Sequence, residues 1–107
     1  MTTINYNKLV RDKIPNIIKE DNKECEIEIV SENEKHQLLE KKLQEEVNEF
    51  LEDKNIEELA DVMEVLFGLA DSLGYSESEL MDVRNKRKEL RGGFKEGIVL
   101  KSVTQND

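Results

Sequence analysis

Three helix-start signals constrain how this chain can fold. Ser31, Asn55 and Ser76 are each followed three residues later by a glutamate. A side chain of this kind at a helix start accepts a hydrogen bond from a backbone N–H of the first turn, and the glutamate can accept one in return. The spacing predicts three helices, over roughly residues 32–53, 55–73 and 76–91. Gly74 is placed to end the second of them.

Two shorter segments have the pattern of half-buried strands. Residues 25–31 (CEIEIVS) alternate apolar and acidic side chains, and residues 97–103 (GIVLKSV) are mostly apolar. We expect two short β-strands that could pair with each other. Cys25 is then a strand residue, and as the only cysteine it excludes an intramolecular disulfide. The single histidine, His36, reads as an ordinary exposed helical residue.

The N-terminal segment differs from the rest of the chain. Pro15 interrupts residues 8–19, which we expect to form an irregular or short helical arm. The expected fold is therefore mostly α, an antiparallel helical bundle with two short strands, in a single domain of residues 1–107. There is no signal-peptide pattern and no apolar run long enough to span a bilayer, which favours a cytoplasmic protein.

Charge is distributed unevenly along the chain. The formal net charge is −9, but residues 20–82 hold 21 acidic and 5 basic side chains, whereas both ends are basic. Binding to duplex DNA needs an uninterrupted cationic face, so this arrangement argues against it. It favours a ligand that combines a metal ion with a polyphosphate, although most of these charges are also typical of solvated helix faces.

Five carboxylates fall at helical spacing on the first two long helices. Glu45, Glu46 and Glu49 lie beside the apolar stripe of the first helix, and Glu58 and Asp61 lie on the first two turns of the next. A short loop makes these helices antiparallel neighbours, so Glu46, Glu49, Glu58 and Asp61 can converge. Each alone would read as a solvated or capping residue. Together they would repel one another unless a divalent cation lies among them, and Mg²⁺ is the natural candidate.

The third long helix carries a basic group on its expected inner face. Arg87 falls between Val83 and Leu90, with Lys86 and Arg91 close by. An arginine that points inward requires an anionic partner. A bound phosphate and the acidic cluster are both candidates, the second as a structural salt bridge.

The second long helix is apolar over more than half of its circumference, which is more than a small bundle needs. We therefore expect it to contact a second subunit in a homo-oligomer. The residues concerned are Ile56, Leu59, Ala60, Val62, Met63, Val65, Leu66, Phe67, Leu69 and Ala70.

The acidic motif and its flanks resemble a known superfamily. KLQEEVNEF (42–50) followed by EELADV (57–62) resembles the E-E-x-x-E…E-x-x-D pattern of the MazG-like, all-α nucleotide pyrophosphohydrolases. YNKLVRDKIPNII (6–18) and RGGFKEGIVL (91–100) resemble the flanks of a small branch labelled phosphoribosyl-ATP-pyrophosphohydrolase-like. The resemblance covers nearly the whole chain.

This resemblance implies hydrolysis of a nucleoside triphosphate between the α and β phosphates, with Mg²⁺ or Mn²⁺, to give the monophosphate and pyrophosphate. It implies an assembly of two or four subunits. The metal ligands that it implies are Glu46, Glu49, Glu58 and Asp61, with Glu45 supporting them or orienting the attacking water. The phosphate-binding residues that it implies are Lys8, Arg11, Lys13, Lys86, Arg87 and Arg91. Attack by water is consistent with the lack of a Cys–His pair or a serine nucleophile motif.

Two other functions fit the same residues. The residues of the motif would bind the metal and the phosphates rather than the base. The substrate could therefore be phosphoribosyl-ATP, an intermediate of histidine synthesis. Alternatively, the chain could be a non-catalytic helical interaction module whose acidic groups face solvent and whose broad apolar helix binds a partner.

Overall fold

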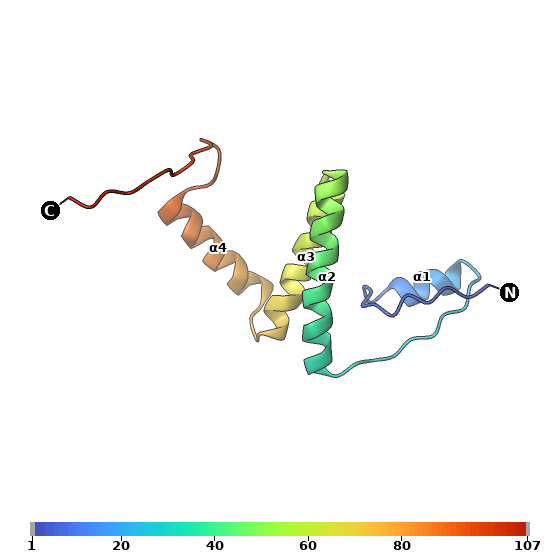
Figure 1. Cartoon of the computed structure of the whole chain (residues 1–107). Helices are drawn as coiled ribbons and strands as arrows, with labels where there is room; N and C mark the ends of the chain where they lie inside the picture. The colour runs from blue at the N-terminus through green and yellow to red at the C-terminus, as the bar shows by residue number, and fades with distance from the viewer. Residues whose placement is uncertain (1, 107) are drawn as a thin grey trace.

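The computed structural model describes residues 2–106, which are mostly helical (Figure 1). Its helices, in chain order, are α1 (Ile14–Glu20), α2 (Glu32–Asp53), α3 (Ile56–Ser72) and α4 (Glu77–Arg91). The mostly α fold expected from the helix-start signals is confirmed. None of the helices found in residues 2–106 is both long and apolar enough to cross a membrane.

All three start signals form the expected hydrogen bonds. The side chains of Ser31, Asn55 and Ser76 each accept a bond from the backbone N–H three residues later, at 3.2, 2.9 and 3.1 Å. At α4 the carboxylate of Glu79 also accepts a bond from the Ser76 backbone N–H at 3.1 Å, which completes a capping box. Each cap stabilises its helix by about 1 kcal/mol, so local sequence alone fixes these helix starts.

A tight connection joins α2 to α3. Lys54 ends α2 in the left-handed conformation, with φ at 52°, and Asn55 begins α3 directly after it. The two helices therefore run antiparallel and lie side by side (Figure 1). This hairpin is the part of the fold that positions the five carboxylates.

The hydrophobic core of the chain is confined to this hairpin. The buried apolar residues of the described chain are Leu39 on α2 and Val65 and Ala70 on α3. Gly68 lets the helices approach closely, because a Cβ atom at this position would lie 3.0 Å from a Leu39 methyl group. A core this small leaves much of the apolar surface of α3 exposed.

The fourth helix diverges from the hairpin. Within the part of the chain that the structure describes, α4 packs against α3 and against no other helix. The expected inner stripe of α4 is therefore not buried: Val83 and Leu90 are exposed, Leu90 to 81%, and Arg87 is exposed with them. The prediction that Arg87 points inward is wrong for the single chain, because no second layer of helices within residues 2–106 covers this face.

The molecule is elongated. It measures 73 × 31 × 22 Å with a radius of gyration of 19.2 Å, whereas a compact chain of this length has a radius of about 13 Å. Both ends extend away from the hairpin (Figure 1). The single chain thus has a helical hairpin at its centre and little tertiary packing elsewhere.

The two expected β-strands do not form. Residues 25–31 and 97–103 are irregular, and no β-strand is present between residues 2 and 106. A strand needs a partner for its backbone groups, and these two segments lie on opposite sides of the hairpin (Figure 1). Most of their apolar side chains face solvent, with Ile29 exposed to 89%. The prediction of a half-buried strand over residues 25–31 is therefore wrong for the single chain, because an alternating pattern does not supply a pairing partner.

Two single-residue predictions also change. Cys25 lies in the irregular segment, half-buried, rather than in a strand. His36 is half-buried rather than exposed, and its Nδ1 atom is 2.8 Å from the hydroxyl oxygen of Ser72 on α3. The arm is partly helical as expected, since α1 occupies its second half with Pro15 in the first turn.

Candidate metal centre

The hairpin brings the five predicted carboxylates together. They form two overlapping groups in which ligand oxygens lie within 4.8 Å of one another: Glu45, Glu46 and Glu49 in one, and Glu46, Glu58 and Asp61 in the other. Glu46 belongs to both. The carboxylates of α2 and α3 therefore lie in two adjoining groups that share Glu46.

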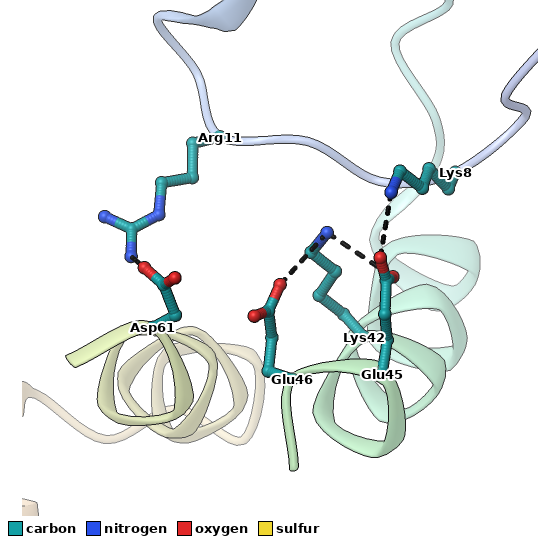
Figure 2. Close-up of polar contacts among 6 residues, drawn as sticks. All are labelled: Lys8, Arg11, Lys42, Glu45, Glu46 and Asp61. Carbon is teal, nitrogen blue, oxygen red and sulfur yellow. Dashed lines mark hydrogen bonds and ion pairs between the residues drawn. The ribbon is translucent and has the colours of Figure 1, made fainter. Parts of the chain in front are cut away.

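Glu46 is the most buried member of the group, with an exposure of only 7%. One of its oxygens, Oε1, is 3.3 Å from Nζ of Lys42, one turn earlier on α2. The same ammonium lies 3.4 Å from Oε2 of Glu45 (Figure 2). Sequence reasoning did not single out Lys42, although its i,i+3 and i,i+4 spacing to these two glutamates is the signal that would have found it.

Two carboxylate oxygens of the cluster lack a partner. Oε2 of Glu46 and Oε2 of Glu58 are buried, and neither has a hydrogen-bond donor among residues 2–106. Oε2 of Glu58 therefore does not cap the start of α3, although the position of Glu58 in the sequence is also typical of a capping residue. A buried acceptor without a donor is costly, so these two oxygens indicate a missing cationic or proton-bearing partner.

The cluster shifts the pKa values of its members in opposite directions. Burial, and then the neighbouring Glu49, raise the pKa of Glu46 above its ordinary value. Burial, followed by the charges of Asp61, Asp53 and Glu46, raises the pKa of Glu58. In contrast, the hydrogen bond from Lys8 lowers the pKa of Glu45. The two carboxylates with unpartnered oxygens are thus the ones for which the charge is unfavourable.

Two basic residues of the N-terminal segment reach the cluster. Lys8 Nζ donates to Glu45 Oε1 at 2.8 Å, and a guanidinium nitrogen of Arg11 donates to Asp61 Oδ1 at 2.6 Å. Figure 2 shows both side chains pointing from this segment toward α2 and α3. The side chains of Lys8 and Arg11 are 43% and 54% exposed, and ion pairs this open contribute about 0–1 kcal/mol each.

The other predicted phosphate-binding residues lie apart from the cluster. Four residues are concerned, and none of them forms an ion pair with a described residue. The first, Lys13, is exposed at the start of α1. The remaining three are on α4, which does not touch α2. These residues are Lys86, Arg87 and Arg91.

The donor set fits a hard divalent cation. All five groups offer carboxylate oxygens, the ligands such cations prefer, and they come from two rigid helices. Mg²⁺ holds oxygens at about 2.0–2.1 Å, so oxygens on opposite sides of it lie about 4 Å apart. This separation falls within the 4.8 Å that encloses the ligand oxygens of each group. The unpartnered oxygens of Glu46 and Glu58 are the ones a cation would complete.

Comparisons of the chain with protein-family models, with curated proteins and with solved structures found no match.

Proposed function

We propose that this chain is a nucleotide pyrophosphohydrolase that uses Mg²⁺ or Mn²⁺ to cleave a nucleoside triphosphate into the monophosphate and pyrophosphate. One observation carries the proposal: carboxylates from two helices converge around Glu46, which is buried and has an oxygen without a hydrogen-bond partner. The motif resemblance gives this cation-binding arrangement its substrate class. A purely solvated acidic face would have no reason to bury Glu46.

In this proposal the helices supply the ligands and the arm supplies the counter-charge for phosphate. Glu46, Glu49, Glu58 and Asp61 hold the cation, and Glu45 orients the attacking water. When bound, the cation would polarise phosphate oxygens and lower the pKa of a water ligand. Of the predicted phosphate-binding residues, Lys8 and Arg11 are the ones that contact the cluster, whereas the contributions of Lys13 and the three α4 residues stay predictions.

The function is tested by pyrophosphate release from a panel of nucleoside and deoxynucleoside triphosphates with Mg²⁺ or Mn²⁺. We expect pyrophosphate and monophosphate in equal amounts. Glu49→Gln should lower the rate more than about 100-fold, since even residues behind a metal ligand are worth about 10–100-fold. The matched control is Glu52→Gln, an exposed glutamate one turn away on α2 that forms no ion pair with any described residue and should retain activity.

Including phosphoribosyl-ATP in the panel tests the alternative substrate directly. Turnover of that compound alone would assign the chain to histidine synthesis. If no compound releases pyrophosphate while circular dichroism shows a helical protein, the proposed enzyme is wrong. The remaining alternative is then the non-catalytic interaction module.

We also propose that the chain assembles as a homo-oligomer. Much of the apolar surface of α3 is exposed in the single chain, at Ile56, Leu59, Met63, Leu66 and Leu73, which follows it directly. An apolar surface of this extent is typical of an interface rather than of a solvated face. The small core of the hairpin leads to the same proposal, because apolar surface buried between subunits would add stability that the single chain lacks.

A further inference from the structure

Residues 7–12, here called the strap, cross the candidate metal centre. The strap has no helical or strand structure. It connects to the hairpin through ion pairs that join residues far apart in sequence, Lys8 with Glu45 and Arg11 with Asp61. Figure 2 shows the strap spanning the space above both helices.

The strap pairs with one carboxylate of each acidic group. Glu45 belongs to the group formed on α2, and Asp61 to the group that Glu46 shares with α3. The ammonium of Lys8 and the guanidinium of Arg11 therefore form ion pairs with carboxylates that a divalent cation would also use. A cation bound by the cluster and these two side chains repel each other and compete for the same negative charge.

The strap is held loosely. Among residues 2–13, Leu9 is the only one that is half-buried, and the others are exposed. A cavity of about 70 Å³ remains between the strap and α2, lined by Leu9, Leu38 and Lys42 among others. A segment with few buried apolar contacts and exposed ion pairs opens at low free-energy cost.

We propose that the strap is a displaceable counter-ion for the acidic cluster: Lys8 and Arg11 neutralise Glu45 and Asp61 until a divalent cation takes their place, and the strap then leaves the helices. This inference rests on the proposed metal centre and adds to it a competition between cation and strap. The released Lys8 and Arg11 are then free to pair with an anion.

The first test measures Mn²⁺ binding without nucleotide, from the electron paramagnetic resonance signal of free Mn²⁺. The double variant Lys8→Met/Arg11→Gln should bind Mn²⁺ about fivefold or more tightly than the parent, the range expected when two binding events oppose each other. The control is Lys41→Met, which removes one positive charge a turn before Glu45 but breaks no ion pair between described residues. It should change the affinity much less.

The second test follows the strap itself. A nitroxide label is attached at Val10→Cys, between the two basic residues, in a Cys25→Ser background that removes the only native cysteine. Saturating Mg²⁺ should increase the mobility of the label. In the double variant the label should already be mobile without Mg²⁺.

The outcomes separate the strap from the metal centre. If the parent binds Mn²⁺ but the label is unaffected by Mg²⁺, and the double variant binds no more tightly than Lys41→Met, the strap proposal is overturned while the metal centre stands. If neither the parent nor the double variant binds Mn²⁺, both fail. If the double variant binds Mn²⁺ and the parent does not, the strap prevents cation binding in the parent, and this outcome supports the proposal.

Discussion

Glu46 determines the charge balance of the candidate site. Its carboxylate is buried between α2 and α3, with one oxygen near Lys42 and the other without a partner. Burial raises the pKa of Glu46, so the folded protein binds a proton at this group more readily than the unfolded chain does. Without a cation, ionisation of Glu46 as the pH rises therefore lowers the stability of the fold.

We predict that Glu46→Gln raises the free energy of unfolding by about 1 kcal/mol at neutral pH in the presence of a chelator, because a neutral amide replaces a buried charge. The difference in the free energy of unfolding between variant and parent should narrow as the pH falls through the raised pKa of Glu46. The parent then also has a neutral side chain at this position, because Glu46 is protonated. Urea unfolding at several pH values measures this effect.

The exposed Glu52→Gln serves as the control, and its stability should stay within about 0.5 kcal/mol of the parent. With Mg²⁺ added, the parent should become more stable than the Glu46→Gln variant, because Mg²⁺ stabilises the parent whereas the variant has lost a central ligand. A parent that Mg²⁺ does not stabilise would contradict this interpretation of Glu46.

At the scale of elements, the contact between α2 and α3 depends on one close approach. Gly68 faces the side chain of Leu39, and a Cβ atom there would lie 3.0 Å from a methyl group of that leucine. Leu39 is itself buried in the core. The alignment of the two helices, and with it the convergence of the carboxylates, therefore depends on a small residue opposite a large one.

We predict that Gly68→Val destabilises the protein by about 1–3 kcal/mol through overpacking. Leu39→Ala alone should also destabilise it, by about 2–5 kcal/mol, because it leaves a cavity. The double variant should lose less stability than the sum of the two single losses, since the valine then fills the space that the leucine left. Thermal or urea unfolding of the four proteins tests this, and strict additivity would show that the two residues do not meet.

At the scale of the whole molecule, the single chain buries too little to be compact. Its radius of gyration is 19.2 Å, and among the helices of residues 2–106 α4 packs only against α3. The apolar residues of the C-terminal segment are exposed. Apolar surface removed from water contributes about 25 cal/mol per Å², so an assembly that covers α3 and α4 would gain substantial stability. The elongated shape is thus the physical basis for the proposed oligomer.

We predict that the parent sediments as an oligomer and that Leu66→Glu on the exposed face of α3 shifts it toward the monomer, because a charge would then be buried in the interface. Analytical ultracentrifugation measures the mass. Glu64→Gln, an exposed neighbour on the same helix, should leave the assembly intact. A parent that is monomeric at all concentrations would contradict the proposed interface.

The sequence by itself determined the helices and their spacing. Ser31, Asn55 and Ser76 start them through hydrogen bonds within one turn, and the acids of α2 and α3 fall on one side because of the helical repeat. These are local interactions, so neighbouring residues are enough to specify them.

Tertiary structure alone decided the rest. It buried Glu46, placed the strap's Lys8 and Arg11 on the acidic cluster, left Arg87 in solvent and kept residues 25–31 and 97–103 from pairing. Each of these depends on which distant segment lies nearby, because burial, ion pairing across 37 or 50 residues and β-pairing all require a partner that the local pattern does not name.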